Sequence, residues 1–301
     1  MRAPLVLAAA LLAAPAAADP VSRLVVFGDS NVDVGRLAAE MASDPADGRL
    51  PPPGTVGERL SDGPLLPEHA AEALDVPMVS HAWAGATAGQ VNLAALRLGL
   101  SDALPTGTLA QIDEFEAGLP DGAADARALY LVAAGSNDLF PADKDDPAAV
   151  DAAVAGATAN LEAAVRRLDG LGARRIVLVA RTPRPVLSGA PRPDQEPDPA
   201  ARDDAAGRQF NAALAGLAAG LDAELAAQVS LLDAYAAIRE IVEGSGAPGG
   251  FEPYSADPSR YCVVRPECGA LVNYDHVHKT SAVHAVLARR LLADLGLAPA
   301  R

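Results

Sequence analysis

Five residues, spread over almost the whole chain, have the types needed for acyl transfer through a serine nucleophile. They are Ser30, Gly85, Asn137, Asp275 and His278. A serine hydroxyl needs a base that takes its proton and a carboxylate that holds this base in the correct tautomer. His278 and Asp275, three residues apart, could fill these two roles for Ser30. The Gly85 N–H and the Asn137 side-chain amide could donate to the oxyanion that develops on the attacked carbonyl.

Each of these segments also has a purely structural explanation. Asp29 and Ser30 directly follow an apolar run, where helix N-caps are common. Gly135 and Asp138 bound a tetrapeptide that is typical of a turn, and Gly85 could serve a tight turn without any chemical role. The chain has no G-x-S-x-G motif, which disfavours the arrangement of α/β-hydrolases. In the functional interpretation, Asp29, Gly135 and Asp138 support the site.

Four potential metal ligands lie near the C-terminus, and they suggest an alternative. They are Asp275, His276, His278 and His284. Zinc requires three or four converging ligands, but the chain shows no H-E-x-x-H or similar helical spacing. A G-x-G-x-x-G match at residues 244–249 contains a proline and follows a predicted helix, so it does not indicate a dinucleotide site. We therefore expect neither a metal nor a cofactor.

The segments between these residues alternate in a way that predicts a doubly wound α/β fold. Short apolar runs predict strands at residues 23–27, 76–83, 128–134, 175–180 and 229–233. Ala/Leu-rich stretches predict helices at residues 67–74, 109–117, 147–168, 205–226 and 281–295. Such sheets are mainly parallel, and ligands bind beyond the carboxyl ends of their strands. Ser30, Gly85 and Asn137 each follow a predicted strand, so the sheet would bring them to one edge.

Two irregular segments, residues 43–64 and 184–204, interrupt this alternation. Both are rich in Pro, Gly and Asp and are longer than most connections in compact domains. Either segment could flank the active site or form a surface loop. No repeat or linker divides the rest, so we expect residues 19–301 to form a single domain.

The first 18 residues predict an export signal. Arg2 precedes an apolar run that is too short to span a bilayer, and small residues follow at positions 16–18. The alternative is a disordered Ala-rich terminus. Cleavage would leave the protein in the periplasm or outside the cell, where disulfides form. Cys262 and Cys268 would then pair, the alternative being two independent buried thiols.

The composition excludes several classes of function. The 301 residues include 24 Lys and Arg against 39 Asp and Glu, a formal net charge of −15. Such a chain repels nucleic acids and anionic lipid surfaces. After residue 18 no stretch reaches the roughly 18 apolar residues of a membrane helix. We expect an exported monomer that acts on small-molecule or lipid substrates, without nucleic-acid partners or membrane insertion.

Taken in order along the chain, the motifs resemble those of the SGNH hydrolases, the GDSL family of lipases and esterases. They are residues 27–35 (FGDSNVDVG), 82–87 (AWAGAT), 135–138 (GSND) and 275–278 (DHVH). Residues 59–64 (RLSDGP) and 172–176 (GARRI) resemble further segments of the longer members. The resemblance covers nearly the whole chain after residue 18, and its strength comes from the ordered set.

The resemblance implies a flavodoxin-like three-layer α/β/α fold and hydrolysis of carboxylic esters through an acyl-enzyme. Ser30 would be the nucleophile and would give one oxyanion N–H, while Gly85 and Asn137 would supply the other two donors. His278 would be the base and Asp275 the acid that orients it.

The departures from the family pattern concern substrate preference and remove no catalytic group. Asn31 replaces the leucine of the GDSL motif, and Ala84, Arg36 and Lys279 stand where many members have Gly, Asn and Pro. The leading hypothesis is therefore a secreted lipase or esterase of unspecified acyl chain. The alternatives are a carbohydrate O-acetylesterase on the same fold and a non-catalytic binding protein.

Overall fold

The computed structural model describes residues 20–43, 59–184, 199–243, 251–252, 257–265, 267–298 and 300. The predicted export signal, residues 1–18, lies outside the described residues, as do most of both irregular segments.

A five-stranded parallel sheet forms the centre of the molecule. Its strands are β1 (Leu24–Gly28), β2 (Met78–Ser80), β3 (Leu129–Ala133), β4 (Arg175–Val179) and β5 (Gln228–Leu232). They lie in the order β2-β1-β3-β4-β5, and every pair is parallel. This is the flavodoxin-like order. The strand order, not the strand direction, reverses between β1 and β3, and this switch point leaves a crevice at the carboxyl ends of these two strands.

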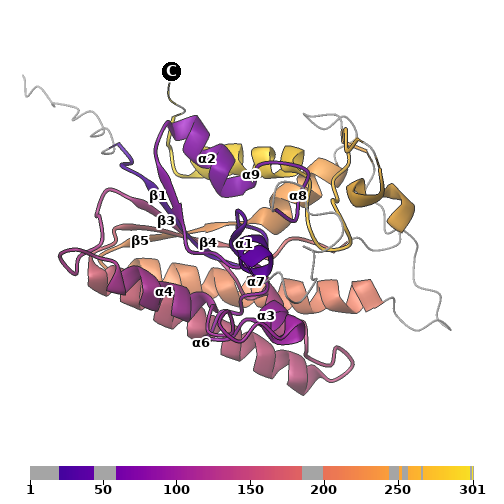
Figure 1. Ribbon diagram of the computed structural model, residues 1–301, viewed down its shortest axis with the longest axis horizontal. Helices are drawn as coiled ribbons and strands as arrows, with labels where there is room; N and C mark the ends of the chain where they lie inside the picture. Colours follow the sequence, from indigo (N-terminus) through magenta and orange to yellow (C-terminus); the bar gives the residue numbers. More distant parts are fainter. Residues whose placement is uncertain are drawn as a thin grey trace, which may run out of the picture.

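Helices cover both faces of the sheet, which explains why the central strands β1 and β3 are buried along their whole length (Figure 1). One face packs against α4 (Thr108–Ala117), α6 (Pro147–Leu171) and α7 (Pro199–Glu224). The other packs against α2 (Leu66–Leu74), α8 (Ala234–Glu243) and α9 (Ser281–Asp294). Within β1, Val25 and Phe27 belong to the first core, whereas Leu24 and Val26 belong to the second. The predicted three-layer α/β/α fold is thus confirmed.

Shorter elements gather beyond the carboxyl ends of the strands. They are α1 (Arg36–Ser43), α3 (Leu93–Leu98), α5 (Ser136–Leu139) and the 3₁₀ turns η2 (Pro258–Arg260) and η3 (Cys262–Val264). A small third core joins α1 and α3 through Leu37, Trp83 and Ala95. These elements surround the edge at which Ser30, Gly85 and Asn137 were expected.

Two expectations about boundaries were wrong. The strand predicted at residues 76–83 is only Met78–Ser80, because β2 is an edge strand that pairs with β1 over three residues. The irregular segment predicted up to residue 204 ends earlier, since α7 begins at Pro199. Within the described part of the chain, no helix combines the length and apolar character needed to cross a membrane.

Candidate active site

A chain of hydrogen bonds links Asp275, His278 and Ser30. Oδ2 of Asp275 lies 2.7 Å from Nδ1 of His278, and Nε2 of the same ring lies 2.9 Å from Oγ of Ser30. Ser30 follows β1, whereas Asp275 and His278 precede α9. In the sequence, His278 lies 248 positions after Ser30. In this geometry the imidazole can take the serine proton on one side while the carboxylate holds it from the other.

The surroundings of the Asp275 carboxylate favour its charged form. Burial alone would raise its pKa, but the His278 ring and two backbone N–H groups outweigh this effect and lower the pKa well below its usual range. These N–H groups, of Val277 and His278, both donate to Oδ1 at 2.7 Å. Oδ2 is thereby left to accept from the imidazole, which fixes the ring orientation.

Three hydrogen-bond donors lie around the serine hydroxyl. No described residue accepts a hydrogen bond from the backbone N–H of Ser30 or of Gly85. Asn137 lines the same pocket as these two residues, and its Nδ2 donates one hydrogen to the carbonyl oxygen of Ala86 at 2.9 Å. An amide nitrogen carries two hydrogens, so one remains for an oxyanion.

Two residues that the sequence analysis did not single out hold these donors in place. Oδ2 of Asp33 accepts from the Ala84 N–H at 2.7 Å, while its Oδ1 accepts from Arg36 N–H at the start of α1. Asn92 caps α3 and donates from Nδ2 to the carbonyl oxygen of Ala84 at 3.0 Å. The loop that carries Gly85 is therefore fixed from both sides. Asp33 lies within the 27–35 motif, which was its sequence signal, whereas Asn92 lies in none of the motifs.

Glycine is required at two of the predicted positions. Gly85 has φ +86°, and a Cβ there would lie 2.3 Å from the Cβ of Ala94. Gly135 has φ +107°, and a Cβ there would lie 2.3 Å from the ring of Phe210. Both positions combine the left-handed backbone with close packing, so the motif glycines serve geometry as well as any chemistry.

The two carboxyl groups expected to support the site differ in burial, since Asp29 is buried and Asp138 is half-buried. Burial raises the pKa of Asp29, and hydrogen bonds from the backbone and side chain of Asn31 offset this only in part. Burial also raises the pKa of Asp138 to about 6, while its Oδ2 accepts from the Ala88 N–H. Asp29 thus binds the backbone just after Ser30. Asp138, the residue after Asn137, binds the backbone at Ala88, just after the Gly85 loop.

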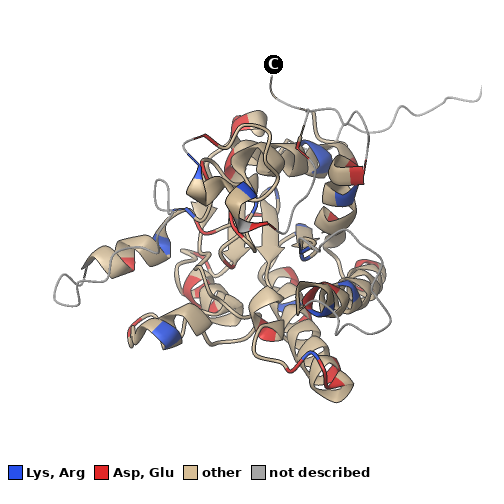
Figure 2. Cartoon of the chain, turned by 90° about the vertical axis from the view of Figure 1, so that its right-hand side faces the viewer, with Lys and Arg blue, Asp and Glu red and all other residues tan. Residues whose placement is uncertain are grey.

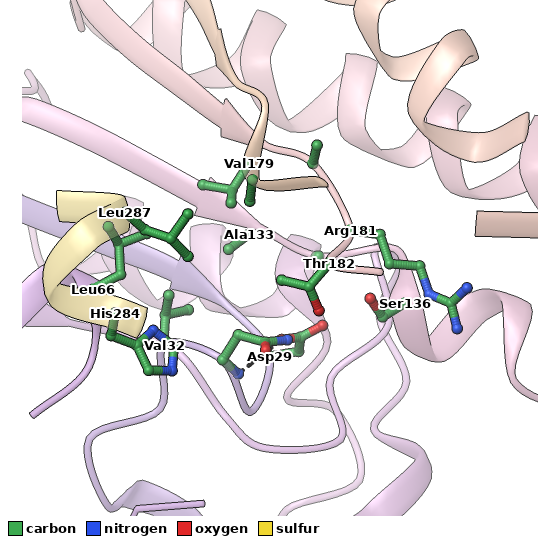
Figure 3. Close-up of a pocket in the computed structure, with 14 residues that line it drawn as sticks. Asp29, Val32, Leu66, Ala133, Ser136, Val179, Arg181, Thr182, His284 and Leu287 are labelled. Atoms are coloured by element: carbon green, nitrogen blue, oxygen red, sulfur yellow. Dashed lines mark hydrogen bonds between the residues drawn. The ribbon is translucent and has the colours of Figure 1, made fainter. Parts of the chain in front are cut away.

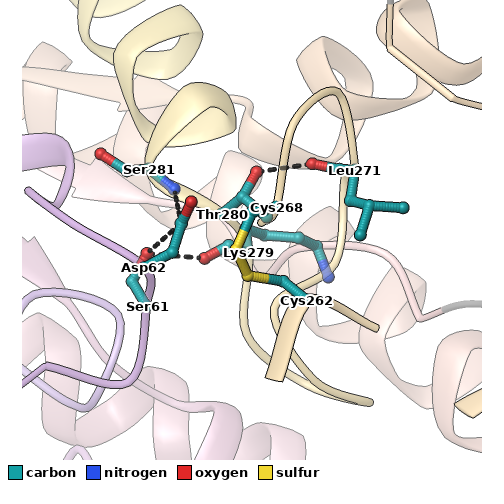
Figure 4. Close-up of a disulfide and its surroundings, with 8 residues drawn as sticks. All are labelled: Ser61, Asp62, Cys262, Cys268, Leu271, Lys279, Thr280 and Ser281. Atoms are coloured by element: carbon teal, nitrogen blue, oxygen red, sulfur yellow. Dashed lines mark hydrogen bonds between the residues drawn. A yellow bond between two sulfur atoms is a disulfide. The ribbon is translucent and has the colours of Figure 1, made fainter. Parts of the chain in front are cut away.

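The segment 59–64 anchors the loop that follows His278 (Figure 4). Ser61 donates from Oγ to the carbonyl oxygen of Lys279 at 3.0 Å, and Asp62 accepts from the Ser281 N–H at 2.7 Å. These contacts cross more than 200 residues of sequence and flank His278 on its C-terminal side. These contacts give residues 59–64 a structural role beside His278, although the two segments lie far apart in the sequence.

A disulfide joins Cys262 to Cys268 on the other side of the same loop. The Cys262 N–H donates to the carbonyl oxygen of Asn273, and the Tyr274 N–H donates to that of His278. The bridged segment therefore packs on the backbone that leads into Asp275.

We expect reduction of this disulfide to lower both activity and stability. The loop it closes is short, so the loss in unfolding free energy is about 2 kcal/mol by the chain-entropy relation. Thermal unfolding and ester hydrolysis should be measured with and without reductant. The control is the Cys262→Ala/Cys268→Ala variant, which should not respond to reductant. A wild-type protein that also does not respond would show that the bridge does not brace the base.

The four potential metal ligands near the C-terminus do not converge. Asp275 and His278 bind each other, whereas His284 lies on α9 and lines a buried chamber behind Asp29 (Figure 3). Among the described residues the one cluster of possible ligands is Asp62, Cys262 and Cys268, in which both sulfurs already form the disulfide.

We expect His284 to make the protein sensitive to acid. Burial, and then the nearby His69, His278 and Lys279, lower the pKa of this histidine to about 3. The unfolded chain, with a pKa near 6.5, therefore binds one more proton between pH 6.5 and 3, so stability falls as the pH falls through this window. Urea unfolding of wild type and His284→Leu at several pH values should diverge by up to about 1.4 kcal/mol per pH unit. Parallel stability curves would contradict this assignment.

The pocket over the serine has a volume of about 340 Å³. One part of its wall is apolar, formed by side chains of α1, α3 and the preceding loops: Leu37, Leu60, Ala84, Leu93, Ala94 and Leu98. Other lining residues are polar or charged, among them Arg184, Asn137 and His276. The space next to Ser30 thus has room for more than an acetyl group.

Comparisons with known proteins concern the family and the fold of the chain. The family model described as GDSL-like Lipase/Acylhydrolase matches residues 24–291. Among solved structures, phospholipase A1 from Streptomyces albidoflavus NA297 is 16% identical with a TM-score of 0.50, covering 91% of this chain and 99% of that one. This likeness supports the fold. No curated protein matches the chain significantly.

Two further solved structures have lower TM-scores. The extracellular lipase from Streptomyces rimosus is 17% identical, with a TM-score of 0.48 and coverage of 91% of this chain and 99% of the other. Axe2, an acetylxylan esterase from Geobacillus stearothermophilus, is 16% identical, with a TM-score of 0.49 and coverage of 94% and 98%.

Proposed function

The chain belongs to the GDSL-like lipase/acylhydrolase family and hydrolyses esters, and from this premise we propose that Ser30 is its nucleophile. The observation that carries the proposal is the hydrogen-bonded chain from Asp275 through His278 to Ser30. A binding protein would have no need for these three groups in this geometry.

The proposed reaction proceeds through an acyl-enzyme. His278 takes the proton from Oγ of Ser30 as this oxygen attacks the ester carbonyl carbon. The oxyanion receives hydrogen bonds from the Ser30 and Gly85 N–H groups and from Nδ2 of Asn137. The protonated imidazole then gives its proton to the leaving alcohol, and a water molecule activated by the same base releases the acid. Asp275 remains charged and holds the ring throughout.

Esters of increasing acyl chain length test the proposed substrate class. The apolar wall next to Ser30 supports acyl groups longer than acetyl, which favours an esterase or lipase over a carbohydrate O-acetylesterase. Hydrolysis of p-nitrophenyl esters from C2 to C12, with Ser30→Ala as control, tests this proposal. A rate that peaks at acetyl would favour the carbohydrate esterase, and activity unaffected by Ser30→Ala would exclude the serine mechanism.

The Asn137→Ala variant tests whether this side chain is an oxyanion donor or only a turn residue. We expect Asn137→Ala to lower kcat about 10²–10³-fold, the usual loss for one oxyanion donor. Asn137 also donates to Ala86, so kcat and thermal stability must be measured together. Asp138→Asn, one residue along, is the matched control for the packing of the 84–88 loop. If Asn137→Ala lowers stability alone and leaves kcat unchanged, the residue is structural.

We further propose that residues 1–18 direct export and that residues 19–301 act as one domain and as a monomer. The disulfide supports an oxidising compartment, because such bonds are rare in the reducing cytosol. All of the proposed catalytic groups come from one chain, so the proposed reaction does not require a second copy. Intact-mass measurement of material secreted by the native host would test both the cleavage site and the bridge.

A further inference from the structure

The loops after four neighbouring strands all contribute to the pocket over Ser30. In the order of the sheet the contributing residues include Gly85 after β2, Ser30 after β1, Asn137 after β3 and Arg184 after β4. The first three are accounted for by the proposed ester hydrolysis. Arg184 is the fourth, and the apolar wall of α1 and α3 lies toward the other end of this row.

Arg184 is a nearly buried cation with donors to spare. Its side chain is 8% exposed, and its Nε donates to Oδ2 of Asp203 at 2.7 Å. Oδ2 of Asp203 also accepts from Nη2 of the buried Arg181, so one carboxylate serves two guanidinium groups. No described residue accepts a hydrogen bond from Nη1 or Nη2 of Arg184. Neither nitrogen is among the fully buried atoms without a partner, so both retain access to the pocket, where a ligand can accept hydrogen bonds from them.

The electrostatic influence of Arg184 reaches both ends of the proposed catalytic pair. Its charge lowers the pKa of Asp29, which precedes Ser30, although burial dominates there and raises the pKa overall. It also helps burial to lower the pKa of Lys279, which follows His278, to about 7. The protein as a whole carries a net charge of −15, and acidic residues are spread over the helices seen in Figure 2. The lining of the pocket contains two arginines, Arg97 and Arg184, against one carboxyl group, that of Asp29, and this excess of cationic side chains favours anions.

The position of Arg184 indicates which part of a substrate it would meet. The carbonyl oxygen of Pro183, its neighbour in sequence, accepts from Nζ of Lys279, so the loop of Arg184 is attached to the residue after the base. His278 must protonate the leaving oxygen, and the alcohol portion of an ester therefore lies on the side of the base. The acyl portion is left with the apolar wall of α1 and α3.

We propose that Arg184 binds an anionic group, a carboxylate or a phosphate, on the alcohol portion of the ester. This inference rests on the proposed ester hydrolysis and adds the substrate class to it: an apolar acyl chain esterified to an anionic alcohol. A planar guanidinium with two free terminal nitrogens suits either anion, because both accept paired hydrogen bonds.

Matched esters of hexanoic acid test the proposal. Carboxymethyl hexanoate and 2-phosphoethyl hexanoate carry the anion on the alcohol, isobutyl hexanoate is the neutral isostere of the first, and monoisobutyl adipate carries the anion on the acyl part. We expect wild type to hydrolyse at least one alcohol-side anion with a kcat/KM about tenfold or more above that of isobutyl hexanoate. In Arg184→Gln this ratio should fall about 10–100-fold, as expected for a lost hydrogen bond to a charged group, and Arg184→Lys should retain part of it.

Arg97 provides the matched control. It lines the same pocket, but its guanidinium lies over the ring of Phe140, 4.6 Å from the centroid. Arg97→Gln should leave the ratio of anionic to neutral substrates unchanged. Thermal unfolding of each variant shows whether the Asp203 contact was needed for folding, and Arg184→Lys keeps the test valid if the glutamine variant is unstable.

Four results would overturn the proposal. Equal hydrolysis of the charged and neutral esters by wild type would exclude an anion site while leaving ester hydrolysis intact. A ratio that falls in Arg97→Gln but not in Arg184→Gln would assign the anion site to Arg97. A preference for monoisobutyl adipate would place the anion at the acyl end. No hydrolysis of any of these esters or of the p-nitrophenyl series would reject the proposed function together with this inference.

Discussion

Ser30→Ala is expected to lower kcat for the best p-nitrophenyl ester by about 10⁴–10⁶-fold, with the fold intact. His278→Ala should cause a loss of similar size, and the double variant should lose hardly more than either single one. The reason is that a nucleophile and its base act as one unit, so that removal of either leaves only binding and the oxyanion donors. The 2.9 Å contact between Oγ and Nε2 is the structural basis of this expectation.

The control for this experiment is another serine that lines the same pocket. Ser136 begins α5, and no described group forms a hydrogen bond with its hydroxyl. Ser136→Ala should stay within a few-fold of wild type. Losses in the Ser30 and His278 variants that simply add on a logarithmic scale would show that the two residues do not share one step.

Asp275→Asn is expected to lower kcat about 10³–10⁴-fold, the scale seen for this change in a serine protease triad. The asparagine can still accept from the Val277 and His278 N–H groups, so the loop should keep its shape. Its NH₂ group would face Nδ1 of His278 and would favour the tautomer that carries hydrogen on Nε2. That tautomer cannot accept the proton of Ser30.

The pH–rate profile separates this effect from a structural one. Because the wild-type Asp275 carboxyl has a lowered pKa, it is charged throughout the neutral range, and the deficit of Asp275→Asn should persist from pH 6 to 9. Asp62→Asn, which alters a carboxylate anchoring the same loop, is the control and should affect stability more than kcat. If Asp275→Asn retains activity within tenfold of wild type, another group orients the imidazole.

Strands could be predicted from sequence wherever they are buried on both faces. The predicted strand at residues 175–180 corresponds to Arg175–Val179, because an apolar run bounded by polar residues marks a covered parallel strand. The edge strand was harder to delimit, since Met78–Ser80 is only partly buried and the apolar pattern continues past it into the Gly85 loop. The start of α7 was missed because Asp203 and Asp204 made its first turns resemble a loop.

Within the site, sequence order revealed the residues that would perform the chemistry but few of those that hold them. Ser30, Asn137 and His278 stand in short motifs directly after strands or before a helix, and such places recur in this kind of sheet. Asn92 and Arg184 have no local pattern, because their roles depend on backbone atoms and loops brought near only by folding. In the sequence, Arg184 lies in a Pro-rich segment that is typical of a solvent-exposed loop. Its burial depends on its partner Asp203, which only the fold brings beside it.

The hydrogen bond between Ser30 and His278 joins residues 248 positions apart, and this separation bears on how the protein is made. The ribosome delivers the proposed nucleophile early and the proposed base almost last, and α9, which closes the second core, follows His278. A chain that ends before His278 would carry Ser30 without its proposed base. We therefore expect the ability to hydrolyse esters to arise only at the end of synthesis.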